Sequence, residues 1–149
     1  MKRVVLSDSE IKALASVGKL KIDPFVESSL SPAGYDLRSG VEHVLKPLES
    51  VLLPTLERVE LPKSVLGVLH LRSSFAREGV IASLALVDPG FRGQLTILLF
   101  NSGRNEVRIG RGERLVQIAF FELSREAEKG YSGSYQDSAG IVRSARGCT

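Results

Sequence analysis

Residues 80–100 read VIASLALVDPGFRGQLTILLF, and this stretch decides the fold class. Two apolar runs, at 80–87 and 95–100, flank a short segment that contains Asp88 and a Pro-Gly pair. Apolar runs of about four to eight residues bounded by Gly and Pro are typical of strands, and Pro-Gly is typical of a turn. We therefore predict a β-hairpin, with Asp88 partly buried where its first strand meets the turn.

Further short strands are predicted on both sides of this hairpin, at residues 20–22, 51–53, 59–61, 65–71 and 115–121. Pro54 and Pro62 are expected to end two of them. One helix is predicted before these strands, because Ser7 and Glu10 form a capping box and Gly18 provides a stop. Many short strands without intervening helices indicate an all-β fold, a sandwich or a barrel, with a short N-terminal helix.

Composition narrows the class of protein. The chain has 149 residues, the size of one domain, with 43% hydrophobic and 25% charged residues. Its apolar runs are far shorter than the ~20 residues that a membrane helix needs, so no membrane partner is expected. The single cysteine, Cys148, and two histidines cannot form a zinc cluster or an intrachain disulfide, which favours a cytoplasmic location. The net charge of +3 comes from basic residues spread along the chain, and we do not expect nucleic-acid binding.

The C-terminal residues differ in composition from the rest of the chain. Residues 1–127 form the predicted β domain, whereas residues 128–149 are rich in Gly, Ser, Arg and Tyr. Such a segment cannot bury enough apolar surface to order by itself. Two interpretations stay open: a frayed tail, or an arm that orders over a ligand or onto a neighbouring subunit.

Residues 71–79 combine two arginines with two hydroxyl side chains. The planar guanidinium groups of Arg72 and Arg77 suit phosphate oxygens, and Ser73 and Ser74 add neutral donors. The segment is therefore a candidate oxyanion site. A capped turn with solvated arginines is the structural alternative.

Asp88 and Gln117 are the other candidates for chemistry. Asp88, at the end of a hydrophobic strand, could act as a general base, or it could cap the turn through its own backbone. Gln117 lies among apolar neighbours, where it could satisfy a backbone group or donate to a phosphate. The chain lacks the glycine-rich loops that bind nucleotide phosphates and the signature of the zinc deaminases.

Taken in order, four segments resemble the motifs of the dUTPase and dCTP deaminase superfamily. They are residues 32–38, 72–74, 79–93 and 112–117. The resemblance covers nearly the whole chain and is strongest to the archaeal-type dUTPases. It implies a distorted β-barrel or jelly roll, assembled as a homotrimer with active sites between subunits and with the arm over a neighbour's site.

The two activities of this superfamily differ at a position that this chain has changed. The similar deaminases carry a catalytic glutamate on the strand after the third motif, and the matching residue here is Leu98. No Asp or Glu occurs from residue 89 to 105, and leucine cannot transfer protons. Many deaminases also carry Lys-Tyr-Gln-Gly-Gln in the tail, where residues 134–138 here read SYQDS. Both departures favour hydrolysis of dUTP to dUMP and pyrophosphate.

The resemblance also implies a role for each candidate residue. Asp88 is expected to be the catalytic base that activates water for attack on the α-phosphorus, while backbone groups of residues 79–93 recognise uracil. Mg²⁺ is expected to be carried mainly by the triphosphate, with Asp36 either holding a metal-bound water or bracing its loop. The expected substrate-binding residues are Arg72, Ser73, Ser74, Arg77, Phe91, Gln117 and Tyr131. Two alternatives stay open: a dCTP deaminase, with or without dUTP hydrolysis, and a non-catalytic nucleotide-binding regulatory trimer.

Overall fold

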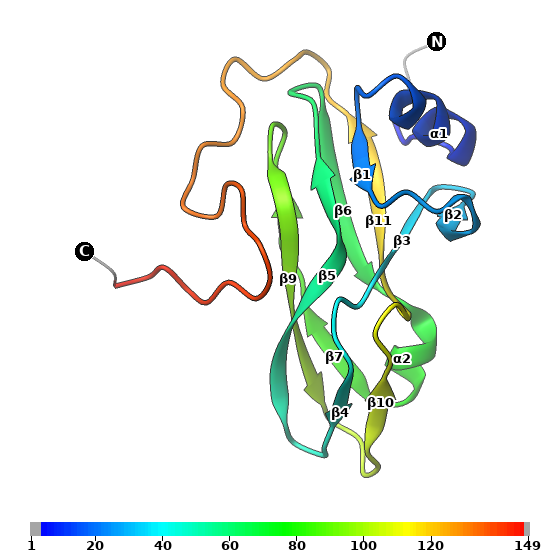
Figure 1. Cartoon of the computed structure of the whole chain (residues 1–149), viewed down its shortest axis with the longest axis vertical. Coiled ribbons are helices and arrows are strands. Elements are labelled where there is room, and N and C mark those ends of the chain that lie inside the picture. The colour runs from blue at the N-terminus through cyan, green and yellow to red at the C-terminus, as the bar shows by residue number, and fades with distance from the viewer. Residues whose placement is uncertain (1–3, 148–149) are drawn as a thin grey trace.

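Two antiparallel sheets make up most of the molecule (Figure 1). The computed structural model describes residues 4–147, so Cys148 lies outside the described residues. The four-stranded sheet has the order β1-β5-β9-β7, the five-stranded sheet has the order β2-β3-β11-β6-β8, and β4 pairs with β10 in a separate ribbon. The strands are β1 (Lys21–Asp23), β2 (Leu30–Ser31), β3 (Gly34–Arg38), β4 (His43–Leu45), β5 (Ser50–Glu60), β6 (Val65–Leu71), β7 (Val80–Ser83), β8 (Leu86–Val87), β9 (Arg92–Asn101), β10 (Val107–Ile109) and β11 (Arg114–Glu122).

Alternating side chains from both sheets form one core. On β9, for example, Ile97 and Leu99 are buried, while Leu98 between them is not. This alternation follows from the pleat of a strand, which sends successive side chains to opposite faces. The predicted all-β class with a short N-terminal helix is confirmed. Among residues 4–147, none of the helices has the length and apolar character needed to cross a bilayer.

The N-terminal helix α1 (Asp8–Ser16) begins where the capping box was predicted. The Ser7 hydroxyl accepts from the backbone N–H of Glu10 at 3.4 Å, and the Glu10 carboxylate accepts from the backbone N–H of Ser7 at 3.0 Å. The helix stops before Gly18, whose φ of 71° lies in the left-handed region that glycine adopts easily. Ile11 is fully buried and anchors the helix to the core.

Pro54 does not end a strand, contrary to the sequence-based expectation. The two short strands predicted at 51–53 and 59–61 are both parts of β5, which runs without interruption. Its pairing with β9 shifts register between Pro54 and Arg58, which marks a β-bulge. A bulge leaves a backbone group out of the ladder, and a proline is therefore tolerated there.

The bulge also places a carboxylate in the interior. Glu57 is fully buried, and its Oε1 accepts from Nε of Arg38 at 2.6 Å. Its Oε2 accepts from the backbone N–H of Arg38 at 2.8 Å. Because Arg38 ends β3 in the other sheet, this buried ion pair ties the two sheets together.

The predicted hairpin around Asp88 is wrong in its pairing. Residues 80–87 split into β7 and β8, with a break at Leu84 and Ala85. β7 pairs with β9 in the four-stranded sheet, whereas β8 pairs with β6 in the five-stranded sheet. The segment that carries Asp88 therefore crosses from one sheet to the other. A continuous apolar run gave no sign of this change of sheet.

The C-terminal segment, residues 128–147, is called the arm below. It leaves the barrel after β11 and returns along the four-stranded sheet, where Figure 1 draws it in orange and red beside β9. Gly93 of β9 and Ser138 of the arm form a parallel β-bridge within the same chain.

Candidate functional site

The Asp88 turn, residues 88–91, connects β8 to β9. The backbone N–H of Phe91 donates to the carbonyl of Asp88 at 3.0 Å, and Gly90 has a φ of 84°. A Pro followed by a residue with positive φ is the signature of a type II turn. The Asp88 backbone closes the turn, and its carboxylate has no hydrogen bond or ion pair within residues 4–147. Asp88 is also exposed in the single chain instead of partly buried, because the two-residue β8 is an edge strand.

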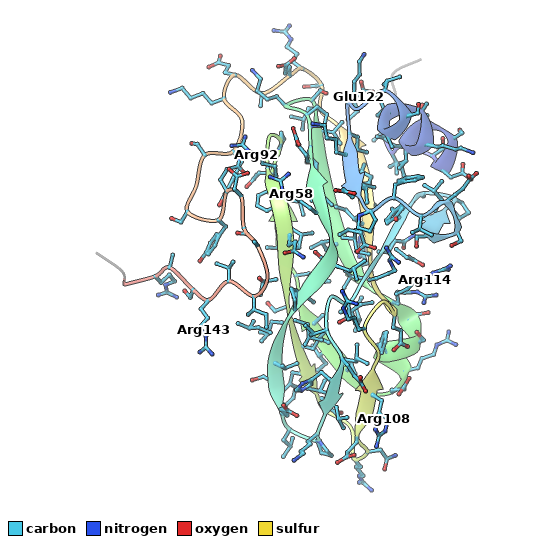
Figure 2. All side chains as sticks on the ribbon, viewed as in Figure 1. Arg58, Arg92, Arg108, Arg114, Glu122 and Arg143 are labelled. Atoms are coloured by element: carbon cyan, nitrogen blue, oxygen red, sulfur yellow. The ribbon has the colours of Figure 1, made fainter. Side chains whose placement is uncertain are left out.

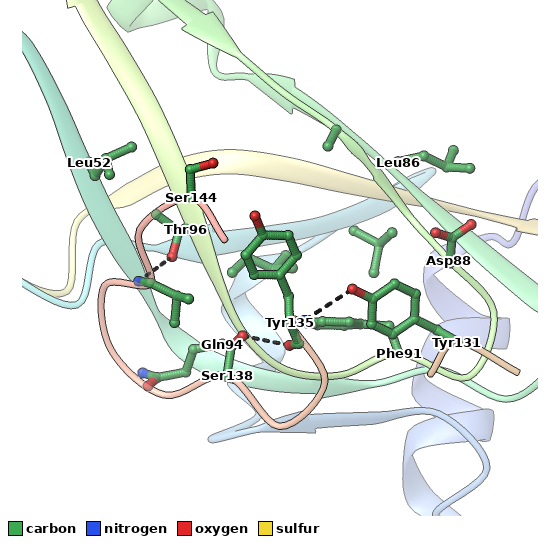
Figure 3. Close-up of a pocket in the computed structure, with 14 residues that line it drawn as sticks. Leu52, Leu86, Asp88, Phe91, Gln94, Thr96, Tyr131, Tyr135, Ser138 and Ser144 are labelled. Atoms are coloured by element: carbon green, nitrogen blue, oxygen red, sulfur yellow. Dashed lines mark hydrogen bonds between the residues drawn. The ribbon is translucent and has the colours of Figure 1, made fainter. Parts of the chain in front are cut away.

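A pocket of about 380 Å³ opens between this turn, β9 and the arm (Figure 3). Its walls are mostly apolar or aromatic, and hydroxyl groups from β9 and the arm add a few polar points. Asp88 is the one acidic side chain among the described residues that line it. The lining comprises Leu52, Ala85, Leu86, Val87, Asp88, Phe91, Gln94, Leu95, Thr96, Tyr131, Tyr135, Ser138, Val142 and Ser144.

Two predicted substrate-binding residues meet at this pocket. The rings of Phe91 and Tyr131 pack edge to face, with centroids 5.5 Å apart. Phe91 is 7% exposed, so the arm residue Tyr131 covers it in the single chain. The Tyr131 hydroxyl accepts from the backbone N–H of Tyr135 at 3.2 Å, which fixes a second aromatic ring at the pocket.

Leu98 lies on the same face of β9 as two pocket residues, Gln94 and Thr96. It is 37% exposed and faces Leu52 of β5 and Ser83 of β7 in the sheet register. The position where the similar deaminases carry a glutamate is therefore on the pocket side of β9. In this chain that position is apolar, although its neighbours on the same face, Gln94 and Thr96, are polar.

A second cluster of predicted residues lies where β3, β11 and β6 run side by side. Gln117 pairs with Asp36 on one side and with His70 on the other in the strand register. Nε of Arg72, just after β6, lies 3.4 Å from Oδ2 of the nearly buried Asp36. The Gln117 amide donates to the Ser31 hydroxyl at 2.5 Å. The cluster thus holds a guanidinium and an amide side by side, with one carboxylate.

Ser73, Ser74 and Arg77 belong to a short helix next to this cluster, α2 (Ser73–Arg77). The helix follows Arg72 directly, and all three side chains are exposed. The structural alternative given for this segment, a capped turn, is therefore replaced by one short helix. The hydroxyls and the Arg72 guanidinium remain close along the chain, as a phosphate-binding segment requires.

One chain does not bring the two clusters together. Val87 pairs with Gly67 of β6, so Asp88 lies beyond this pair, on the side away from Arg72. At about 3.3 Å per residue, the extended stretch from Gly67 in β6 to Arg72 just after it spans about 17 Å. Asp88 and the Asp36–Arg72–Gln117 cluster therefore sit at opposite ends of β6.

Several pocket residues escaped the sequence reasoning. Leu52 and the β9 residues Gln94 and Thr96 lie in strands that read only as core, and the outward-facing alternation was the available signal. Tyr135 was part of the tail pattern but received no role. Among the described residues, no three His, Cys, Asp or Glu side chains gather to hold a metal ion.

Comparison with known sequences gives one family. A family model described as dCTP deaminase-like matches residues 40–123. The dCTP deaminase of Pyrococcus furiosus is 46% identical over 143 residues, which covers 86% of this chain and 92% of that protein. A protein named probable deoxyuridine 5'-triphosphate nucleotidohydrolase, from Sulfolobus islandicus rod-shaped virus 1, is 35% identical over 154 residues, with 93% and 97% covered.

Solved structures with both kinds of name share the fold. The dCTP deaminase from Agrobacterium tumefaciens superposes with a TM-score of 0.70 at 21% identity, covering 81% of this chain and 47% of that one. This chain thus spans about half of the length of that deaminase. A mutant dUTPase of phage phi11 of S. aureus gives a TM-score of 0.59 at 19% identity, with 78% and 98% covered.

Proposed function

This chain belongs to the dCTP deaminase-like family, and from that premise we propose that it hydrolyses dUTP to dUMP and pyrophosphate. The observation that carries the proposal is the chemistry of the pocket. Among the described residues that line it, Asp88 is the one acid, and Leu98 stands where the resemblance to deaminases implies a glutamate for proton transfer. A single carboxylate suffices to activate water for hydrolysis, whereas deamination must also protonate the leaving amine.

The pocket suits a pyrimidine base with its deoxyribose. Apolar walls and the Phe91 ring supply contact area, and backbone groups of residues 79–93 that the arm does not engage would pair with the edge of the base. Uracil presents an acceptor where cytosine presents an amino group, so a fixed backbone donor separates the two bases. A mismatched base would leave a buried polar group without its partner, which costs about 1–3 kcal/mol.

Asp88 is the proposed catalytic base. Its carboxylate, which has no hydrogen bond or ion pair with any residue from 4 to 147, would accept a proton from the water that attacks the α-phosphorus. The rate enhancement would then come mostly from positioning the water and the α-phosphorus and from neutralising the charge of the phosphates. We assign the phosphates to Arg72, Ser73, Ser74 and Gln117, with Arg77 at the edge of the same segment.

Because Asp88 and Arg72 lie at opposite ends of β6, a site that uses both needs a second copy of the chain. We therefore propose that Asp88 of one subunit meets the phosphate-binding cluster of another, in a homotrimer. A closed ring of three subunits with head-to-tail contacts would repeat such a site three times.

Mg²⁺ is the metal that this reaction would use. Asp36 is the one carboxylate of the phosphate-binding cluster formed by Asp36, Arg72 and Gln117, and it is paired with Arg72. A single protein carboxylate fits Mg²⁺, because the other ligands of this ion would be phosphate oxygens and water. Bound there, Mg²⁺ would neutralise triphosphate charge. Asp36 would orient one of its waters. The phage phi11 dUTPase described above is a structure with a structural Mg(II) ion.

A dCTP deaminase is the second candidate. The observation in its favour is the name of the relatives. The protein from Pyrococcus furiosus, which is 46% identical to this chain, is named dCTP deaminase. Deamination by this chain would need an acid–base group other than the residue at 98.

One experiment separates the two candidates. The protein is incubated with Mg²⁺ and either dUTP or dCTP, and nucleotides and pyrophosphate are resolved by ion-exchange chromatography. We expect pyrophosphate and dUMP from dUTP, and no product from dCTP. Conversion of dCTP to dUTP would support the deaminase, and turnover of neither nucleotide would leave a binding protein.

Matched variants test the assignment of Asp88. Asp88→Asn should abolish hydrolysis while dUTP still binds, because the amide cannot accept the proton but keeps the shape. Glu106→Gln removes one negative charge from an exposed loop outside the pocket and serves as the control. Near-normal turnover by Asp88→Asn would refute its role as the base.

Co-expressed Asp88→Asn and Arg72→Ala chains test the shared site. If each site takes Asp88 and Arg72 from different subunits, about a quarter of the sites in randomly mixed trimers combine two intact residues. Activity near that fraction of wild type is expected, although each variant alone is inactive. No recovery would mean that one chain supplies both residues.

A further inference from the structure

Asp137 in the arm has a left-handed backbone conformation, which Asp adopts more readily than most residues other than glycine. Its φ is 60°, in the left-handed region where residues other than glycine are uncommon. Residues held in such conformations often serve a function that the surrounding contacts maintain. Asp137 is also about half exposed, so burial of its side chain does not account for the conformation.

Its carboxylate is bound by two arginines of the barrel. Nε of Arg92 donates to Oδ1 at 2.7 Å and Nη2 of Arg92 donates to Oδ2 at 2.9 Å, a bidentate pair. Nη2 of Arg58 donates to Oδ1 at 2.8 Å. Figure 2 places both arginines on the side of the barrel that faces the arm. Asp137, Arg92 and Arg58 are called the arm clasp below.

Electrostatics agree with this geometry. Hydrogen bonding from Arg92 lowers the pKa of Asp137, with smaller contributions from the charges of both arginines. The same bond raises the pKa of Arg92. Glu60 is the other acid close by, with its carboxylate 3.8 Å from Nη1 of Arg58 and 3.3 Å from Nζ of Lys21.

The clasp lies next to the Asp88 turn because Arg92 is the first residue after it. The neighbouring Gln136 accepts at Oε1 from the backbone N–H of Arg92 at 2.9 Å and donates from Nε2 to the carbonyl of Gly90 at 3.0 Å. The backbone N–H of Asp137 donates to the carbonyl of Arg92 at 2.9 Å. Farther up the arm, the backbone N–H of Tyr131 donates to the carbonyl of Pro89 at 2.8 Å. The arm therefore bonds the turn at each residue from 89 to 92 except Phe91, which Tyr131 covers.

Two glycines show how closely the arm is fitted to its own chain. A Cβ added at Gly90 would stand 2.7 Å from Cα of Gly130, and one added at Gly93 would stand 2.8 Å from the backbone N of Ser138. Backbone approaches this close leave no room for a side chain. Gly90 lies in the Asp88 turn, and Gly93 is the second residue of β9.

We propose that Asp137 is a positioning residue, which clasps the arm onto its own chain and so holds both the Asp88 turn and the wall of the pocket in place. Its effect on turnover rests on the proposed function, whereas its effect on the arm does not. The Asp137 carboxylate fixes Arg92, Gln136 fixes the backbone on either side, and Asp88 follows as part of the same turn. The arm of a chain and the Asp88 of that chain then act together on one nucleotide.

Two substitutions separate the carboxylate from the backbone conformation. Asp137→Gly relieves the positive φ and removes every side-chain contact, whereas Asp137→Asn keeps the size and loses the charge. Arg58→Gln removes one of the three contacts with the carboxylate. The control is Glu128→Gln, which changes an exposed acid of the arm that has no hydrogen bond or ion pair within residues 4–147.

The first readout is hydrogen exchange of the intact protein, read on peptides that cover residues 131–142. We expect exchange to rise about three- to fivefold in Asp137→Gly and Asp137→Asn, less in Arg58→Gln and not at all in the control, as suits a half-exposed ion pair. Wild-type exchange should also rise with salt, because exposed charges are screened, and the salt dependence should be lost in Asp137→Gly.

The second readout is steady-state hydrolysis of dUTP. We expect both Asp137 variants to lower kcat/KM about three- to tenfold, through a higher KM as the pocket wall loosens and a lower kcat as Asp88 loses its support. Unchanged exchange in Asp137→Gly would overturn the inference, and so would raised exchange with wild-type kcat/KM. If the wild-type protein hydrolyses no dUTP, the proposed function fails, and the exchange data with their salt dependence still decide whether the clasp exists.

Discussion

Replacing Arg38 by Met tests how much the buried ion pair stabilises the barrel. The substitution removes the guanidinium but keeps the backbone N–H that donates to Oε2 of Glu57. Glu57 is 0% exposed and the Arg38 side chain is 20% exposed, so little solvent can replace the lost partner. Removing one member of a buried pair costs about 3–5 kcal/mol. We expect a loss near the lower end, about 3 kcal/mol, because one hydrogen bond to the carboxylate remains.

The matched variant removes both charges. In Arg38→Met/Glu57→Leu no uncompensated carboxylate is left, and the free energy of unfolding should return to within about 1 kcal/mol of wild type. A buried nitrogen supports this expectation, because Nη2 of Arg38 has no hydrogen-bond partner among the described residues. Such an atom costs about 1–3 kcal/mol, and both variants recover this cost because each replaces the guanidinium by an apolar side chain.

Urea unfolding followed by far-UV circular dichroism measures these differences, since the chain contains no tryptophan to report by fluorescence. The protomer concentration must be the same in every sample, because any assembly would shift the apparent stability by mass action. A loss below about 1 kcal/mol in Arg38→Met, or a double variant no more stable than the single one, would refute the reasoning.

Three further predictions concern the helix, the turn and pH. Ser7→Ala should lower the free energy of unfolding by about 1 kcal/mol, measured by the same urea unfolding, because the capping box loses its acceptor. Gly90→Ala should release the arm, seen as faster hydrogen exchange at residues 131–142, because the new methyl group would meet the arm backbone at a positive φ. Protection of the arm should stay constant from about pH 5 to 9. The pKa of Asp137 is lowered, so the ion pair is present above the ordinary value of 3.8 and is lost only as the pH falls through the lowered pKa. A loss of protection near neutral pH would contradict this assignment.

Local signals in the sequence predicted the elements that depend on local contacts. The capping box fixed the start of α1, and the apolar runs at 65–71 and 115–121 correspond to β6 and β11. The prediction that Pro54 ends a strand was wrong because the effect of a proline depends on the pairing of its strand. Here Pro54 borders the β-bulge in the pairing with β9, where the N–H that proline lacks is not needed for the ladder. Pairing between strands depends on residues far apart in the chain, so it cannot be predicted from a short segment of the sequence.

The candidate site was predictable in its residues but not in its geometry. Asp88, Arg72 and Gln117 stand out because charged or amide side chains interrupt apolar runs, whereas their separation along β6 follows only from the register of β8. The burial of Glu57 was not predicted, because an acid between Leu56 and Arg58 is typical of an exposed position. The contacts of Asp137 were equally hidden, because Arg58 is 79 residues away in the chain.

The parallel bridge between Gly93 and Ser138 also shields part of a sheet edge. β7 pairs with β9 only from Leu98 onward, so the backbone of Arg92 and Gln94 depends on the arm for its hydrogen bonds on that side. An open edge of this kind invites pairing with another molecule and leads to aggregation. A chain shortened before residue 128 would therefore lose solubility along with its pocket wall. Point substitutions in the arm are consequently a cleaner test of its role than its removal.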